Sequence, residues 1–145
     1  MEALGRLTRR QVDALRAIGP RETTEHGVSL KLIAASLKVR PPSALAHVTP
    51  LEKFGLVERH RGKSRLTPRG RATLLEYQRH HRVAETLFSQ LGLSAEATCA
   101  AAREVDLSLS HQTVERVCAA EGHPSVCPHG EPITPCSDRK GGGSP

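Results

Sequence analysis

The sequence predicts a mainly α-helical chain that begins with a winged helix-turn-helix and continues as a second helical unit. Two short segments with helical apolar spacing lie between residues 30 and 53 and are joined by a tight turn. A basic turn between two strand-like segments follows at residues 57–67, and a long helical pattern starts at Thr67-Pro68. A helix pair followed by a basic hairpin is typical of the winged helix-turn-helix.

The first predicted helix covers residues 8–18. Val12, Leu15 and Ile18 share one face at helical spacing, and Thr8 is a suitable N-cap. Gly19-Pro20 ends this helix, and we expect the polar residues 21–27 to form a loop.

The helix pair occupies residues 30–53, with a turn at residues 38–40. The apolar residues that form its inner face are Leu30, Ile33, Ala34 and Leu37 in the first helix and Leu45, Val48 and Leu51 in the second. Pro50 removes a backbone hydrogen bond, so it is expected to bend the second helix unless it lies near the final turn. Residues 54–56 end the pair, and the basic turn at residues 60–63 then forms the wing.

The second unit is predicted to contain three helices. Thr67 caps a long helix of ~24 residues that ends near Leu91, before Gly92. Two shorter helices follow at residues 94–105 and 110–120, and prolines after Gly122 preclude regular structure. The predicted organisation is therefore a winged-helix domain at residues 1–70, a helical domain at 71–136 and a flexible tail at 137–145.

Charge and composition favour a polyanionic partner. Lysine and arginine number 21 against 15 acidic residues, which gives a net charge of +6 and a pI near 9.6. Such a balance favours nucleic acid or an anionic membrane surface, although basic proteins without such partners are common. No apolar window is long enough for a membrane helix, and residues 1–15 do not resemble a secretion signal. We therefore expect a cytoplasmic protein whose partner is double-stranded DNA rather than a membrane.

The predicted DNA contacts come from the second helix of the pair and from the wing. The residues expected to face base edges are Arg40, Ser43, Ala44 and His47. The residues expected to bind phosphates are Lys53, Arg59, Arg61, Lys63 and Arg65. The alternative for Arg40 and Lys53 is a purely solvated surface position.

Six segments together resemble the diphtheria-toxin-repressor family of iron- and manganese-dependent repressors. They are residues 39–43, 51–57, 66–70, 81–85, 109–115 and 127–133. This resemblance implies a winged-helix head followed by a helical dimerisation domain, in a short form without the SH3-like domain of longer relatives. It also implies a homodimer that binds a palindromic operator when a divalent ion, Fe, Mn or Zn, is bound, and that represses metal-uptake or homeostasis genes.

The resemblance also implies a set of metal ligands. His81 and Glu85 match family ligands, and their i, i+4 spacing puts both on one helix face. Cys99 stands where iron sensors usually have histidine, and this thiol shifts the preference toward zinc or ferrous iron. Asp106 matches a family glutamate, and Asp13 matches the N-terminal carboxylate of the manganese sensors.

Three other family ligand positions have lost their ligands. Leu107, Arg103 and Arg10 stand there, and neither leucine nor an arginine cation binds a divalent ion. We hypothesise that the two arginines form salt bridges with Asp106 and Asp13 in place of the metal. The alternative is that the register is one residue out, which makes Glu104 a ligand candidate.

The C-terminal cysteines allow a second site. Cys118, Cys127, His129 and Cys136 have the residue types of a structural zinc site, with His123 nearby, but their spacing is irregular. The alternatives are buried or loose thiols, or a disulfide between Cys127 and Cys136.

The sequence therefore predicts a metal-dependent transcriptional repressor without enzymatic activity, since no nucleophile elbow or phosphate loop is present. The alternatives are a metal-independent architectural DNA-binding protein with a vestigial metal site, or a redox-responsive regulator.

Overall fold

The computed structural model describes residues 3–22 and 26–136. The chain divides into two compact units, Met1–Leu74 and Leu75–Pro145, and each is considered by itself. The division falls inside a long helix, shortly after the boundary that the sequence predicts at residue 70. The predicted tail at residues 137–145 lies outside the described part of the chain.

The first unit opens with three helices and two 3-10 turns. Its elements are η1 (Leu4–Arg6), α1 (Arg9–Ile18), η2 (Gly19–Arg21), β1 (Val28–Ser29), α2 (Leu30–Leu37) and α3 (Pro41–Lys53). Thr8 caps α1 as predicted, because its hydroxyl accepts from the Gln11 backbone and Gln11 reaches back to the Thr8 backbone. Lys38 ends α2 in a left-handed conformation. Pro50 does not break α3, since it lies within that helix's last turn.

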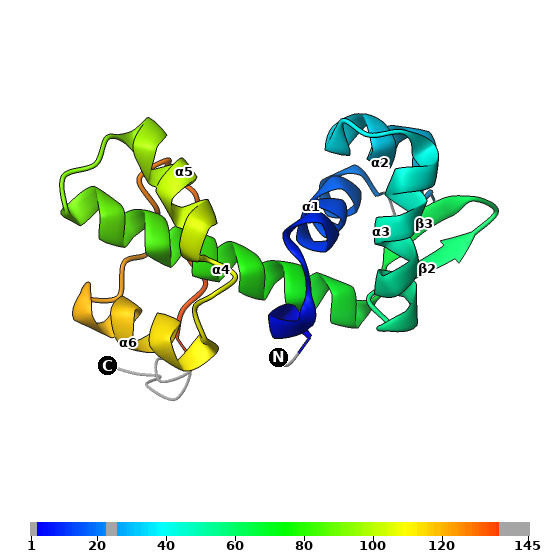
Figure 1. The fold of residues 1–145 in the computed structure, drawn as a ribbon. Coiled ribbons are helices and arrows are strands. Elements are labelled where there is room, and N and C mark those ends of the chain that lie inside the picture. The colour runs from blue at the N-terminus through cyan, green and yellow to red at the C-terminus, as the bar shows by residue number, and fades with distance from the viewer. Residues whose placement is uncertain (1–2, 23–25, 137–145) are drawn as a thin grey trace. The chain divides into compact units, whose positions relative to one another are not determined.

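The wing is a two-stranded hairpin. β2 (Val57–His60) and β3 (Lys63–Leu66) pair antiparallel, with β1 on the other side of β3. Arg61 and Gly62 form the connection and both have positive φ, 50° and 75°. A two-residue turn of this type matches the right-handed twist of the strands. Figure 1 shows the hairpin projecting from the helices of the first unit.

Close packing holds the wing against the start of α4 (Pro68–Gln90). The Thr67 hydroxyl accepts from the Gly70 backbone and donates to the Gly55 carbonyl. A Cβ at Gly70 would overlap the backbone carbonyl oxygen of Leu56, so only glycine permits this approach. Apolar side chains of α1, α2 and α3, including Leu15, Ile33 and Leu51, fill the core of this unit.

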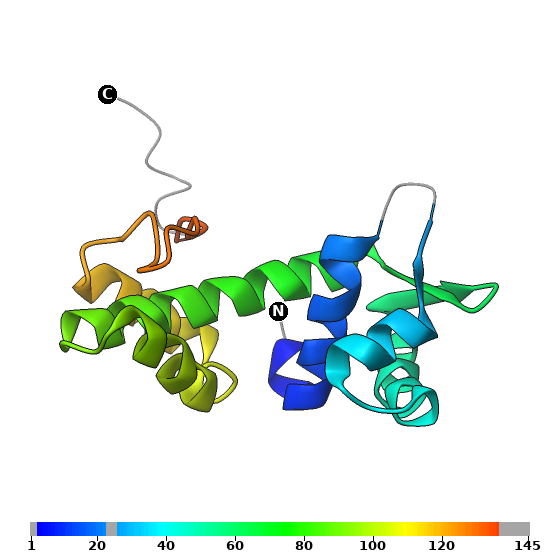
Figure 2. The ribbon, with the colours of Figure 1, turned by 90° about the horizontal axis from the view of Figure 1, so that it is seen from above.

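The second unit is built on the C-terminal part of α4. α5 (Ala95–Val105) and α6 (His111–Ala120) lie beside that part of α4 in both ribbon views (Figures 1 and 2). Ser94 and Ser110 cap these helices, each accepting a hydrogen bond from a backbone amide three residues later. In the part of the chain that the structure describes, no helix is long and apolar enough to cross a bilayer.

A small apolar core and two arginines hold the irregular segment after α6 onto α4. Val83, Val114 and Ile133 form this core together with three buried cysteines, Cys118, Cys127 and Cys136. Arg79 donates from Nε to the Thr134 carbonyl at 3.0 Å, and Arg82 donates to the Pro132 carbonyl at 2.7 Å. The prolines of this segment exclude a helix, so side-chain contacts fix its path.

Candidate functional site

His81 and Glu85 of α4 meet Cys99 of α5 on one face of the second unit. His81 Nε2 lies 3.2 Å from Glu85 Oε1 and 3.7 Å from Cys99 Sγ. One donor atom from each of the three residues lies within 4.8 Å of the others. The structure thus brings together the histidine, carboxylate and thiol that the family resemblance predicts.

Asp106 contacts the other nitrogen of His81. Its carboxylate Oδ2 lies 2.8 Å from His81 Nδ1 and accepts a hydrogen bond of 2.8 Å from the Tyr77 hydroxyl. The Tyr77 ring also stacks on the His81 ring, with centroids 6.0 Å apart. Because an imidazole with one nitrogen on a carboxylate presents the other to an ion, Asp106 and Tyr77 orient His81. Sequence reasoning did not find Tyr77.

Glu85 faces a second pair of donors through its other oxygen. His129 Nδ1 lies 2.7 Å from Glu85 Oε2, although the two are not aligned as a hydrogen bond. Cys127 completes a group of three whose donor atoms again lie within 4.8 Å of one another. The buried Glu85 carboxylate thus faces possible metal ligands on both sides, His81 and Cys99 through one group and Cys127 and His129 through the other.

The four residues of the predicted C-terminal zinc site do not gather in one place. Cys127 and His129 join Glu85, whereas Cys118 and Cys136 lie with His123. Cys118 Sγ is 3.8 Å from His123 Nδ1, and Arg79 Nη2 is 2.9 Å from Cys136 Sγ. All four cysteines are free, so the alternative disulfide between Cys127 and Cys136 is not formed. Burial, with further contributions from Cys118 and Glu115, raises the pKa of the Cys136 thiol to about 12.

A third group of donors lies on another face of α4. Glu76, His80 and His111 have donor atoms within 4.8 Å of one another. Burial raises the pKa of the Glu76 carboxyl. Burial, with smaller contributions from His111 and Arg79, lowers the pKa of His80 to about 4, so its ring is neutral at pH 7. The sequence signal for this group was the i, i+4 spacing of Glu76 and His80, which mirrors that of His81 and Glu85.

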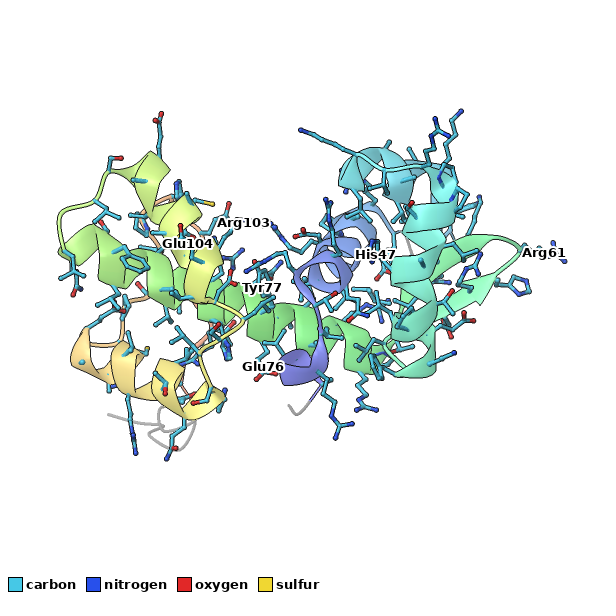
Figure 3. The ribbon with its side chains drawn as sticks, in the orientation of Figure 1. His47, Arg61, Glu76, Tyr77, Arg103 and Glu104 are labelled. Carbon is cyan, nitrogen blue, oxygen red and sulfur yellow. The ribbon has the colours of Figure 1, made fainter. Side chains whose placement is uncertain are left out.

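The remaining predicted ligand, Asp13, belongs to the first unit. Its carboxylate lies 3.6 Å from Arg16 Nη1, and Arg10 donates to the Leu37 carbonyl at 3.2 Å. In the second unit Arg103 is half-buried and Glu104 is exposed on α5, where Figure 3 labels both. The substitution of the metal by salt bridges stays a hypothesis.

The predicted DNA-contacting residues lie on α3, at its two ends and along the wing. Arg40, Ser43 and Lys53 are exposed, and His47 is half-buried. Ala44 is completely buried, so it packs α3 against the core and cannot face a base edge; that part of the prediction is wrong. Its spacing from Val48 and Leu51, i, i+4 and i+7, already marked the inner face of the helix.

The wing carries a basic hollow. Its lining includes the predicted Arg59, Arg61, Lys63 and Arg65, together with His60 of the predicted basic turn, Glu58, and His26 and Gly27, which were predicted to lie in a loop. Arg61 lies at the tip of the hairpin in Figure 3. Cations on a projecting hairpin suit a phosphate backbone.

The comparisons with known proteins agree with this arrangement. Residues 67–135 match the family model described as the metal binding and dimerisation domain of iron dependent repressors. No curated protein matches the chain.

Three solved structures are similar to most of this chain. A hypothetical protein from Sulfolobus solfataricus is 28% identical, with a TM-score of 0.81 over 88% of this chain and 99% of its own. The IdeR protein of T. acidophilum is 27% identical, with a TM-score of 0.68 over 96% of this chain and 63% of its own. A manganese-dependent transcriptional repressor solved with manganese is 30% identical, with a TM-score of 0.73 over 89% of this chain and 59% of its own.

Fold and site together define a winged-helix protein with a helical unit of the iron-dependent-repressor type. The match over residues 67–135 and the similar solved structures are consistent with the family of metal-dependent repressors related to the diphtheria toxin repressor. The chain spans less than two thirds of the length of the second and third structures above.

The residues present fit a divalent transition-metal ion. An imidazole nitrogen, a buried carboxylate oxygen and a thiol sulfur converge at His81, Glu85 and Cys99. Such mixed nitrogen, oxygen and sulfur sites suit Zn²⁺ or Fe²⁺ better than Mn²⁺, which prefers oxygen ligands.

Proposed function

We propose that this protein is a metal-responsive transcriptional repressor that binds double-stranded DNA as a homodimer. The observation that carries the proposal is the group formed by His81, Glu85 and Cys99 inside the matched metal-binding domain. The winged helix-turn-helix with its basic wing supports the DNA-binding part. The expected operator is a palindrome whose half-sites lie about one helical turn apart, or a multiple of it.

The residues of the centre have separate roles in this proposal. His81 Nε2, a Glu85 oxygen and Cys99 Sγ would hold the ion, while Asp106 and Tyr77 keep the His81 ring oriented. A bound cation would neutralise the buried Glu85 and draw α4, α5 and the segment at residues 127–129 together. Cys127 and His129 would share Glu85 with His81 and Cys99.

The test measures bound metal and DNA affinity on the same samples. Protein purified without chelator is analysed for metal content, stripped, and titrated with Zn²⁺, Fe²⁺ and Mn²⁺ while it binds the DNA upstream of its own gene. We expect the stripped protein to bind that DNA at least about tenfold more weakly than the metal-loaded protein, as coupled sites typically show.

Two variants assign the effect to the centre. His81→Ala and Cys99→Ser should lose the ion and the metal-induced gain in DNA affinity, whereas Gln78→Ala, a control on α4 without ligand chemistry, should keep both. Full DNA affinity of the stripped protein would contradict metal control. It would favour the alternative of a constitutive DNA-binding protein, which the replacement of family ligands by Arg103 and Leu107 also supports.

A further inference from the structure

His80 is a buried histidine on the face of α4 that carries Glu76. Its side chain is 3% exposed, neither ring nitrogen has a well-aligned hydrogen bond among the described residues, and a contact with the Asp106 backbone only partly offsets the lowering of its pKa by burial. Buried polar atoms without partners are uncommon, and a missing ion is one reason for them. Metal control of DNA binding through His81, Glu85 and Cys99 does not account for His80, because neighbouring residues on a helix point about 100° apart.

Two further donors converge on His80. Glu76, one turn earlier on α4, places Oε1 3.7 Å from His80 Nε2. His111, at the start of α6, places Nδ1 3.7 Å from the same Glu76 oxygen. The two imidazole rings lie 6.0 Å apart and are tilted by 31°. These separations exceed hydrogen bonds, and they leave room for one ion between the three donors.

The surroundings of His111 select the tautomer that an ion needs. His111 Nε2 lies 3.3 Å from Glu115 Oε1, one turn later on α6, while His111 Nδ1 is buried without a hydrogen-bond partner among the described residues. A carboxylate on one imidazole nitrogen leaves the lone pair of the other available to a metal. Arg79, the nearby cation, also lies 3.3 Å from Glu115 Oε1, which offsets its charge.

We propose that Glu76, His80 and His111 form a separate site for a divalent transition-metal ion, with Zn²⁺ the preferred occupant. Two imidazoles and one carboxylate form a ligand set that zinc accepts with a fourth position open to water. The ion links α4 to α6, so it stabilises the second unit. It shares no ligand with the His81, Glu85 and Cys99 centre, and its donors include no sulfur.

The lack of sulfur allows Co²⁺ to distinguish the sites in the full-length protein. A Co²⁺ ion bound by a thiolate has a sulfur-to-metal charge-transfer band, whereas an ion bound by nitrogen and oxygen has only ligand-field bands. The two test variants are His111→Ala, a half-buried position, and Glu76→Gln, which conserves volume. The control is Gln112→Ala, the exposed neighbour on α6.

We expect both variants to bind one Co²⁺ or Zn²⁺ ion fewer per chain than the wild type and the control, as measured by equilibrium dialysis. The wild-type minus variant Co²⁺ spectrum should contain ligand-field bands and no thiolate band. Unchanged stoichiometry and affinity in both variants would overturn the proposal. So would a thiolate band in the difference spectrum, because the lost ion would then belong to a cysteine-containing centre.

Folding and the other centre are controlled separately. Circular dichroism in chelator should be the same for His111→Ala, Glu76→Gln and the wild type; if one variant unfolds, the other decides the result. Cys99→Ser removes a thiolate of the His81 centre and should leave the difference spectrum unchanged. The metal-binding experiment does not depend on DNA binding, so the proposal for this metal site and the proposed repressor function can be contradicted independently of each other.

Discussion

At the scale of single residues, the contacts of His81 fix the orientation of this proposed metal ligand. Asp106 was predicted to be a ligand, yet its carboxylate faces His81 Nδ1 and not the nitrogen that points to Glu85 and Cys99. The Tyr77 hydroxyl fixes the same carboxylate oxygen. Asp106 and His81 Nε2 therefore lie on opposite sides of one imidazole, and one ion cannot bind both.

Glu121, at the C-cap of α6, gives the protein a pH-dependent stability. Both carboxylate oxygens are buried without a hydrogen-bond partner among the described residues, and burial raises the pKa of Glu121 to about 7. The folded state therefore favours the protonated acid. The stabilisation that the protonated Glu121 carboxyl gives the folded state is complete below pH 4.5, the usual pKa, and is lost as the pH rises toward 7.

We expect Glu121→Gln to stabilise the protein at pH 8.5 and to change little at pH 4. Because the side chain is partly exposed, the gain in unfolding free energy is expected to be about 1 kcal/mol. Urea denaturation in chelator at the two pH values measures it, with Glu96→Gln, an exposed acid on α5, as the control. Equal effects of Glu121→Gln at both pH values would show that the carboxyl titrates normally.

At the scale of elements, the positive charge of the wing can be reduced without disturbing the backbone of its turn. Arg61 occupies the first turn position with a φ of 50°, where asparagine is favoured. Arg61→Asn therefore removes the charge at the wing tip while it suits the turn.

We expect Arg61→Asn to keep the thermal stability of the wild type and to weaken DNA binding for all sequences alike. If Arg61 contacts one phosphate, the slope of log affinity against log salt concentration falls by about one per protomer. Fluorescence anisotropy across a salt series measures this slope. Arg116→Gln, an exposed arginine on α6, serves as the control, and an unchanged slope would exclude Arg61 from the interface.

The helices were predictable because their signals are local. Thr8, Ser94 and the glycine at position 92 mark helix ends by short-range chemistry, and α4 begins and ends within two residues of its prediction. The site was only partly predictable, since His81, Glu85 and Cys99 came from a family resemblance. The grouping of Cys127 with Glu85, and of Cys118 with Cys136, depends on the path of a proline-rich segment without periodicity.

At the scale of the whole molecule, the proposed functions divide between the two units. The basic wing and α3 belong to Met1–Leu74, and the three donor groups around α4 belong to Leu75–Pro145. The boundary between the two units falls inside α4, so this helix contributes residues to both units. A repressor dimer further requires that the second unit present an apolar surface to its copy.

Leu91 is the strongest candidate for that surface. It is 68% exposed just after α4, and Leu87 and Phe88 near the end of that helix are half-buried, whereas Val114 lies in the core. We expect Leu91→Glu to halve the molar mass measured by light scattering, because each half of a twofold interface would then bury an unpaired carboxylate.

Leu32 offers a matched control, since it is a leucine with 54% exposure on α2, outside the predicted interface. Leu32→Glu should leave the molar mass of the wild type unchanged. Leu91→Glu should then also weaken binding to a two-half-site operator while it preserves binding to a single half-site, because only the pairing of the two heads is lost. A dimeric Leu91→Glu variant would place the interface elsewhere on the second unit.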